Sequence, residues 1–329
     1  MQKTTINHFF NKLPELNIMV IGDVMLDAYA WGFTERMSPE APVPVVQIRE
    51  HEYRPGGAAN VALNLHSLGV QTKLLSIVGK DETAERLSQA LQSAGIKDFL
   101  MLPMNDRPTT LKTRIMIGNQ QLLRIDEEEI SDIKQDIAEA FMEIVARELP
   151  QTNAIILQDY DKGLFSPELT AAIISLASKH QIPVAVDPKK RHFFDFKNVS
   201  LFKPNLKELC DGLGKPLYKS QLNVIAEAVE ELRETLSAKA MLLTLSEAGV
   251  MYSSADEQGR FPAHLRSIAD VSGAGDTVIA VAGCCLAAGL SLPDLAALSN
   301  LAGGLVCESL GVVPIKKDKL LAEAILNAN

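Results

Sequence analysis

The clearest chemical signal in the sequence is the glycine-rich segment Asp270–Thr277, which precedes a long apolar run. Small residues at Gly273, Ala274 and Gly275 let the backbone approach a ligand, and the helix that follows would point its free N–H groups at the same place. Asp276 falls in the first helical turn, where the helix dipole favours the ionised carboxylate. The pattern therefore predicts an anion cradle beside a base that takes a proton from a hydroxyl attacking phosphorus. The alternative is a glycine turn in which Asp276 only caps the helix.

The two common phosphate-binding motifs do not occur in the sequence. Gly273 and Gly275 fit the dinucleotide fingerprint, but Val278 stands where the next glycine is required. Lys80 follows a glycine, but Leu74 occupies the position of the first glycine of a Walker A loop. If the chain handles nucleotide phosphates, it uses another cradle.

A second glycine segment suits a polyhydroxylated ligand such as a sugar. Gly56 and Gly57 open a predicted helix that carries Asn60, so bare backbone amides lie close to one side-chain amide. Asp27 follows the predicted strand 18–22 and lies near its carboxyl end, the edge at which open α/β sheets bind ligands. A carboxylate there can accept two sugar hydroxyls. The structural alternatives are a tightly packed loop for the glycines and a turn or cap for Asp27.

Asn205 and Glu208 follow another predicted strand and lie three residues apart, so they share one face of a first helical turn. Oxygen ligands with this spacing can order the water shell of Mg²⁺. The alternative is a capping box, with Asn205 as the cap and Glu208 at the third helical position.

Basic residues gather near these predicted ligand loops although the protein is acidic. One group contains Lys112, Arg114 and Arg124, and another begins at Lys189. Local positive charge of this kind indicates a phosphate on the substrate. The alternative is a solvated charged face.

The elements that must position these residues alternate between strand and helix. Buried strands are predicted from short apolar runs, at 18–22, 74–78, 154–158, 184–186, 201–202 and 241–245. Helices are predicted at 60–68, at 131–149 with Ser131 or Asp132 as the N-cap, and at 166–180 with Ser166 as the N-cap. This order favours an α/β fold with a mainly parallel sheet and helices on both faces.

Two stretches interrupt the alternation. Residues 31–50 carry three prolines, and residues 99–125 contain two or three short strands with no helix between them. We interpret both as a small β-rich lid beside the main sheet, within a single domain of residues 1–329. The alternative is that they are edge strands of the main sheet.

Composition excludes several classes of protein. The net charge of −9 argues against nucleic-acid binding through the overall field. The longest apolar run, 278–290, is shorter than the roughly 20 residues that a membrane span needs. The four cysteines form no CxxC pair, which is typical of a reducing compartment and argues against a structural zinc site. We therefore expect a cytoplasmic protein without a transition metal.

The two glycine segments, in this order and at this separation, resemble the two signatures of the ribokinase-like sugar kinases, the PfkB family. The resemblance covers essentially the whole chain and implies a ribokinase-like fold and phosphorylation of a sugar by ATP with Mg²⁺, with K⁺ as a further candidate ion. It implies that Asp276 is the catalytic base and that the amides of Gly273, Ala274 and Gly275 form the anion hole. By the same resemblance, Asn205 and Glu208 serve Mg-ATP, Glu208 through water, and Thr244 borders the nucleotide.

Within the family, the segments 22–27, 35–45 and 119–124 resemble the kinases that phosphorylate D-glycero-β-D-manno-heptose 7-phosphate on its anomeric hydroxyl. This implies a heptose 1,7-bisphosphate product that leads to ADP-heptose and lipopolysaccharide. It also implies a homodimer that carries the kinase alone, with a separate heptose 1-phosphate adenylyltransferase as pathway partner. The residues expected to hold the sugar are Asp27, Gly56, Gly57 and Asn60. Its phosphate is expected to bind to Arg114, Lys189 or Arg124.

Two rival functions remain open from sequence. A non-catalytic sugar-binding regulator on the same fold would be expected to lack the base, yet Asp276 is present. A dinucleotide-dependent oxidoreductase shares the α/β pattern. It would need an early glycine fingerprint, which residues 21–26 do not supply.

Overall fold

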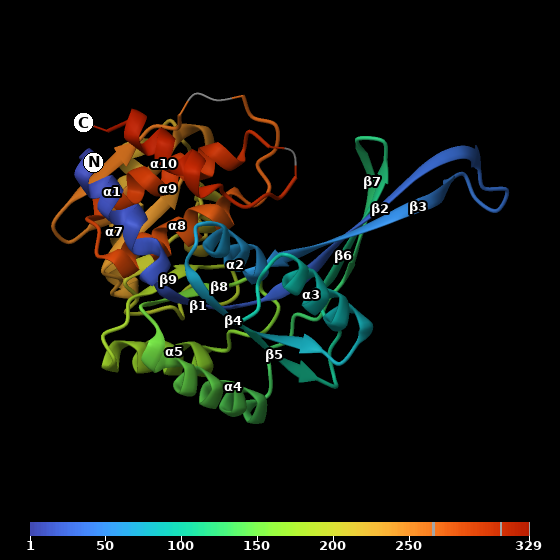
Figure 1. Ribbon diagram of the computed structural model, residues 1–329, viewed down its shortest axis with the longest axis horizontal. Helices are drawn as coiled ribbons and strands as arrows, with labels where there is room; N and C mark the ends of the chain where they lie inside the picture. Colours follow the sequence, from blue (N-terminus) through green and yellow to red (C-terminus); the bar gives the residue numbers. More distant parts are fainter. Residues whose placement is uncertain (265–266, 310, 329) are drawn as a thin grey trace.

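Buried apolar strands and amphipathic helices alternate along most of the chain and build a layered α/β body, from which a second sheet projects (Figure 1). The computed structural model describes residues 1–264, 267–309 and 311–328. The helices are α1 (Lys3–Lys12), α2 (Ala58–Ser67), α3 (Glu82–Ser93), α4 (Gln135–Glu148), α5 (Pro167–Lys179), α6 (Leu206–Leu213), α7 (Leu222–Leu236), α8 (Ala274–Ala288), α9 (Leu292–Val306) and α10 (Lys317–Leu326). The strands are β1 (Asn17–Gly22), β2 (Val24–Met37), β3 (Pro44–Gly57), β4 (Gln71–Gly79), β5 (Phe99–Met104), β6 (Leu111–Ile117), β7 (Gln120–Glu127), β8 (Ala154–Gln158), β9 (Val184–Asp187), β10 (Leu201–Phe202), β11 (Ala240–Thr244), β12 (Val250–Ser254) and β13 (Gln258–Phe261).

The main sheet contains nine of the described strands, in the order β13-β12-β11-β10-β9-β8-β1-β4-β5. All neighbours from β11 to β5 pair in parallel, and only β12 and β13 run antiparallel to their neighbours. The carboxyl ends of β1, β8, β9, β10 and β11 therefore meet at one edge of the sheet. Every predicted strand is present, with bounds that differ by at most a few residues.

The core lies on both faces of this sheet. One apolar cluster packs α1, α2, α8, α9 and α10 against the sheet, with Leu65 and Ile279 among its buried residues. The other packs α4, α5 and α7 on the opposite face, with Phe141 and Ile173 among its buried residues. Figure 1 shows α8, α9 and α10 on one side of the sheet and α4 and α5 on the other. The predicted α/β layering is confirmed. None of the helices in the described part of the chain is long and apolar enough to cross a lipid bilayer.

The second sheet contains four strands in the order β3-β2-β6-β7. Its two long strands, β2 and β3, run outward from the body as an extended antiparallel pair (Figure 1). We call this four-stranded sheet the lid. Strand β2 of the lid follows β1 in the chain, with Asp23 as the one residue between them.

The predicted lid segments were wrong in their bounds. Residues 99–104 form β5, which pairs in parallel with β4 at the edge of the main sheet. The side chains of this strand alternate between the two cores: Phe99 and Met101 pack on one, and Leu100 and Leu102 on the other. The lid begins at Val24, well before residue 31, because the buried first half of β2 already pairs with β3.

The predicted start of the helix at 131–149 was also wrong. Helix α4 begins at Gln135, and neither Ser131 nor Asp132 is its N-cap. The residues before it are held outside the helix, since the N–H of Ile133 donates to the carbonyl of Gly163 and Arg107 donates to the carbonyl of Ser131. The helix predicted at 166–180 is confirmed as α5, with Ser166 as its N-cap.

Candidate active site

Asp276 lies in the first turn of α8, at the edge where the parallel strands end. The turn before it is sharp, since Gly273 adopts a left-handed conformation with φ of 78° that suits glycine. Asp276 is only 5% exposed. Burial raises its pKa to about 6, although hydrogen bonds from Asn60 and Tyr160 act in the opposite direction. The carboxylate is therefore mainly ionised at pH 7 and can still accept a proton.

Asn60, which follows the glycine segment Gly56-Gly57, contacts this carboxylate. Its side-chain amide donates to Asp276 Oδ2 at 2.7 Å. Asn60 is itself held by Asn64, one turn later on α2, whose amide donates to the Asn60 carbonyl. Asn64 Oδ1 accepts from Thr277 Oγ1 at 2.9 Å, so α2 and α8 are joined at two successive residues of α8. This network fixes the orientation of Asn60 and of the carboxylate.

The end of β8 supplies two further contacts to the same carboxylate. The hydroxyl of Tyr160 donates to Asp276 Oδ1 at 2.7 Å. The side-chain amide of Gln158 reaches Asp276 Oδ1 at 3.4 Å and Asp187 Oδ2 at 3.2 Å. Donors therefore face both oxygens of Asp276.

A space next to Gly275 has the character of an anion site. A methyl group on Gly275 would meet nothing closer than Asp187 Oδ2 and Lys203 Nζ, each at 3.9 Å. The Lys203 ammonium is 2% exposed and pairs with Asp187 at 3.0 Å. Backbone amides at the start of α8 and a buried ammonium thus border one small space, which fits a phosphoryl group.

The structure confirms the capping box at the start of α6. The Asn205 side chain accepts from the Glu208 N–H, and the Glu208 carboxylate accepts from the Asn205 N–H, each at 2.8 Å. The other Glu208 oxygen pairs with the Lys189 ammonium. Burial lowers the pKa of Lys189, but the nearby carboxylates of Asp187 and Glu208 outweigh it and raise the pKa above its ordinary value. Thr244 ends β11 and bridges to Asn205.

Three of the residues predicted to hold a sugar, Asp27, Gly56 and Gly57, lie where the lid joins the body. Asp27 on β2 accepts from Arg114 on β6 at 2.6 Å and is 7% exposed. Gly56 leaves room for this carboxylate, since a Cβ there would lie 2.4 Å from Asp27 Oδ2. Gly57 has a positive φ, and a Cβ there would lie 2.4 Å from the Asp23 carbonyl. Both glycines are therefore required by close approach.

One face of the lid gathers charged residues. Arg114 and Arg124 are direct partners across β6 and β7, so their side chains emerge on the same face. Like charges in this position repel one another. The pairs with Asp27 and Asp126 offset the repulsion in part. In the described part of the chain both hydrogen bonds of Arg114 leave from Nη1, which keeps its Nε and Nη2 for an anion.

No cluster of three or more metal-ligating side chains occurs in residues 1–264, 267–309 and 311–328. A Mg²⁺ ion that arrives with ATP is normally held by phosphates, water and one or two carboxylates, which this site can provide. Asp187 Oδ1 is buried and has no hydrogen-bond partner in that same part of the chain. Asp187 and Glu208 thus fit a water-mediated role at such an ion.

The predicted residues fall into two groups. The first group lies around the start of α8 and the neighbouring strand ends. At α8 it contains Asp276, Gly273, Ala274, Gly275 and Asn60, and at the strand ends it contains Lys189, Asn205, Glu208 and Thr244. The second group is Asp27, Gly56, Gly57, Arg114 and Arg124 at the lid. The ion-pair partner of Lys189 is Glu208, so this lysine lies on the side of Asn205 and not with the lid arginines.

Sequence reasoning missed three residues of this arrangement: Tyr160, Asp187 and Lys203. Tyr160 follows the carboxyl end of β8, Asp187 is the last residue of β9, and Lys203 follows β10. The rule that ligands bind at that edge of an open sheet was the signal that could have found them.

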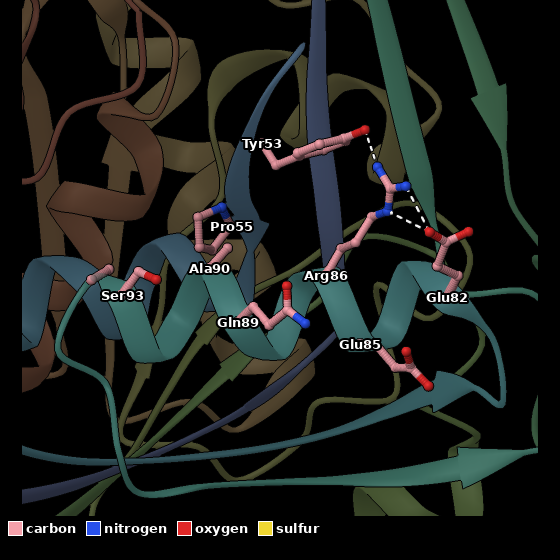
Figure 2. Close-up of a pocket in the computed structure, with 9 residues that line it drawn as sticks. Tyr53, Pro55, Glu82, Glu85, Arg86, Gln89, Ala90 and Ser93 are labelled. Atoms are coloured by element: carbon pink, nitrogen blue, oxygen red, sulfur yellow. Dashed lines mark hydrogen bonds and ion pairs between the residues drawn. The ribbon is translucent and has the colours of Figure 1, made fainter.

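A separate cavity of about 700 Å³ lies between β3 and α3 (Figure 2). Its lining includes Tyr53, Arg86 and Gln89 and contains none of the predicted site residues. Arg86 is already paired with Glu82 and with the Tyr53 hydroxyl. The cavity therefore contributes nothing to the chemistry around Asp276.

The sequence and the fold were compared with known proteins. Residues 15–318 match the profile of the pfkB family carbohydrate kinases. The protein "Bifunctional protein HldE" of Magnetococcus marinus is 40% identical over 317 residues, which cover 95% of this chain and 64% of that protein. The protein of the same name from Pseudomonas paraeruginosa is 40% identical over 312 residues, covering 94% of this chain and 63% of its own length.

This chain thus spans slightly less than two thirds of the length of these relatives. Their name states that two activities reside on one chain. This contradicts the expectation of a separate adenylyltransferase partner, which we withdraw.

Solved structures establish the fold. Phosphofructokinase-2 from Escherichia coli in complex with potassium superposes with a TM-score of 0.77 at 20% identity, covering 94% of this chain and 98% of that one. Ribokinase from Arabidopsis thaliana, complexed with ribose and ATP, gives a TM-score of 0.71 at 18% identity, covering 93% and 98%. The fold is therefore ribokinase-like, as the resemblance implied. With a family match over nearly its whole length, the chain belongs to the pfkB family of carbohydrate kinases.

Proposed function

We propose that the protein transfers the terminal phosphoryl group of ATP to the anomeric hydroxyl of D-glycero-β-D-manno-heptose 7-phosphate. The product would be heptose 1,7-bisphosphate, on a route to ADP-heptose and lipopolysaccharide, made in the cytoplasm. One observation carries the proposal: a buried base at an anion cradle, Asp276 beside Gly275, lies in the same molecule as a lid face with two opposed arginines, Arg114 and Arg124. The sequence identity of 40% to the two HldE proteins supports the choice of sugar.

Asp276 would activate the sugar hydroxyl that accepts the phosphoryl group. Its carboxylate would take the proton of the sugar hydroxyl as the oxygen attacks phosphorus. The amides of Gly273, Ala274 and Gly275 and the Lys203 ammonium would stabilise the charge on the transferred group. Phosphoryl transfer depends mainly on positioning and charge stabilisation of this kind.

The sugar would lie between the glycine segment and the lid. The Asp27 carboxylate would accept hydrogen bonds from its hydroxyls, and the Asn60 amide would donate to them. Gly56 and Gly57 would let the backbone come close to the sugar. The phosphate on the sugar would be gripped by the free donors of Arg114, with Arg124 beside it. A desolvated phosphate needs such a partner, because an unpaired buried charge is costly.

ATP would bind at the strand ends around α6. Asn205, Thr244 and Lys189 would border the ATP, and Asp187 and Glu208 would act on the water shell of Mg²⁺. The ion would neutralise phosphate charge and hold the phosphate chain in position. K⁺ is a further candidate ion for the protein.

The lid would also join two copies of the chain into a homodimer. Its strands expose large apolar side chains, among them Met37, Leu122 and Leu123 at 58%, 45% and 54%. Apolar side chains gathered on an exposed sheet are typical of an interface between proteins.

The test is a kinase assay that follows ADP release with heptose 7-phosphate, unphosphorylated heptose, fructose 6-phosphate and ribose as acceptors. We expect heptose 7-phosphate to give the highest kcat/KM. Arg114→Gln should lower kcat/KM for heptose 7-phosphate by roughly 30- to 150-fold, the scale of a charge-assisted hydrogen bond. The KM for ATP should stay the same.

Two controls accompany this assay. Unphosphorylated heptose, tested with the same Arg114→Gln protein, should show a much smaller loss, since it lacks the phosphate. Arg147→Gln removes an exposed arginine of α4 and should leave kcat/KM unchanged for both substrates. Equal activity of the unmodified enzyme on heptose and heptose 7-phosphate would refute the phosphate site.

A further inference from the structure

The base of the proposed reaction is held from two sides by residues of different kinds. Asn60, on Asp276 Oδ2, is fixed by the network between α2 and α8 and is also expected to touch the sugar. Tyr160, on Oδ1, comes from the turn after β8 and has no part in the mechanism so far. Its hydroxyl oxygen lies 2.7 Å from the carboxylate oxygen, a short distance typical of a charge-assisted bond.

The backbone around Tyr160 is built to hold this position. The N–H of Tyr160 donates to the buried carboxylate of Asp23 at 2.8 Å, and the N–H of Lys162 donates to the same oxygen at 3.1 Å. Asp161 between them adopts a positive φ of 55°, and its N–H donates to Asp159 Oδ1. Three hydrogen bonds from backbone N–H groups to carboxylates keep this strained segment in place, so the backbone from which the tyrosine side chain projects is fixed.

The phenol is a permanent donor. Burial, together with the nearby carboxylates of Asp276 and Asp187, raises the pKa of Tyr160 well above its ordinary value. The hydroxyl therefore keeps its proton at any pH at which the enzyme works, and it can only donate to a carboxylate. A donor of this kind stabilises the ionised form of Asp276.

The other groups that face Asp276 do not make this contact redundant. Asp187 on β9 opposes the ionised form, while Lys203 after β10 favours it and is already paired with Asp187. Lys189 is paired with Glu208 and stacks over the Tyr160 ring. The amide of Gln158 is 3.4 Å from Oδ1 and shared with Asp187, so its contact is weaker than that of the tyrosine.

We propose that Tyr160 is a positioning residue of the catalytic base: its hydroxyl orients the carboxylate of Asp276 and keeps it ionised inside a buried site. The proposal rests on the proposed function. In the reaction, the sugar O–H proton passes to Asp276, the sugar oxygen forms the new bond to phosphorus, and the bond between phosphorus and the ADP oxygen breaks. Tyr160 keeps its own proton throughout and acts on the reaction through Asp276.

The experiment is a pH profile of kcat for Tyr160→Phe, which removes one oxygen atom and keeps the ring. We expect the acid limb of the profile to move to higher pH by about 1 unit, the size of shift that one charge-assisted hydrogen bond produces. Turnover should be lowered about tenfold on the acid side and approach that of the unmodified enzyme above pH 8. The matched control is Tyr218→Phe, the same deletion at a tyrosine that is 61% exposed, which should leave the profile unchanged.

A loss of turnover that is equal at all pH values, or no change at all, would overturn the proposal. Thermal unfolding and ATP binding of Tyr160→Phe show whether the protein is folded. If it is not, 3-fluorotyrosine at position 160 keeps the ring and is a stronger donor, so it should move the acid limb to lower pH. An unmoved limb with this analogue would also refute the proposal. Failure of the proposed function is distinct, because the unmodified enzyme would then show no turnover of heptose 7-phosphate.

Discussion

At the scale of single residues, the site combines burial with donors that face one carboxylate. Burial alone would push Asp276 toward its neutral form, and the hydrogen bonds from Asn60 and Tyr160 return part of that cost. The resulting pKa of about 6 is well above the ordinary value for an aspartate. The carboxylate should accept a proton from a sugar hydroxyl more readily than an exposed aspartate would, because a base works best with a pKa close to the working pH. Activity should fall as the pH drops below 6, because the protonated acid cannot act as a base.

The first prediction concerns the base itself. Asp276→Asn keeps the size of the side chain and one acceptor oxygen but exchanges the other oxygen for an NH2 group, and it cannot accept a proton. We expect kcat to fall by about 10²- to 10⁴-fold, the usual contribution of a general base. ATP binding, measured by calorimetry, and thermal unfolding should stay close to those of the unmodified enzyme. A variant that retains more than about half of the turnover would exclude Asp276 as the base.

The second prediction concerns the cradle. Gly275→Ala adds a methyl group whose nearest neighbours in the protein are 3.9 Å away, so it meets no steric conflict within the fold. We expect the melting temperature to change little, while kcat falls because the methyl group would occupy the space that we propose for the transferred phosphoryl group. Full turnover in a folded Gly275→Ala protein would show that the phosphoryl group binds elsewhere.

Sequence reasoning reached some of these residues and not others. Asp276 and Gly273–Gly275 were predictable because they are neighbours in the chain, so spacing alone places them on one turn. Tyr160, Asp187 and Lys203 come from three different strand ends, and their contacts with the site depend on the order of strands in the sheet. Local sequence patterns carry no information on that order.

At the scale of elements, the start of α6 carries a capping box and is also where we propose a role at the metal, and sequence could not separate the two. Asn205 and Glu208 form the capping box, and Glu208 also pairs with Lys189. A purely structural role would make the charge of Glu208 unimportant. A role at the metal would make it essential.

The third prediction separates these roles with two variants. Glu208→Gln keeps the capping box, because glutamine is also accepted at that position, but it removes the charge. We expect it to raise the Mg²⁺ concentration needed for half-maximal turnover more than the sugar KM. Glu208→Ala should in addition lower stability by about 0.5–2 kcal/mol, the usual cost of a lost cap. If Glu208→Gln titrates with Mg²⁺ like the unmodified enzyme, only the structural role remains.

Elements were predictable where their signal was local. The strands and helix α5 follow from apolar runs and from Ser166-Pro167. The start of α4 was not predictable, because residues 131–134 bond to the distant turn at Gly163 and to Arg107. The placement of β5 was not predictable either, because short apolar strands suit a lid and a sheet edge equally well.

At the scale of the whole molecule, the long strands of the lid project far from the body (Figure 1). Strand β7 is exposed along its whole length and carries three large apolar side chains, Leu122, Leu123 and Ile125. A sheet of this kind is rarely left uncovered. A second copy of the chain is the partner that we propose.

The fourth prediction tests this assembly. Leu123→Asp places a charge on the exposed lid, and we expect it to shift the protein from dimer to monomer in sedimentation or light scattering. Val224→Asp is the matched control, since Val224 is similarly exposed on α7, away from the lid. A monomer in the unmodified protein, or a dimer that Leu123→Asp does not disturb, would contradict the lid interface.

The most direct test of the central claim is the position of the new phosphate in the product. Heptose 7-phosphate and ATP are incubated with the enzyme, and the product is analysed by ³¹P NMR. We predict one ADP for each new phosphate and a phosphorus signal coupled to the anomeric proton, with no such signal for Asp276→Asn. A phosphate on another carbon would contradict the account, and so would turnover of fructose 6-phosphate with none of heptose 7-phosphate.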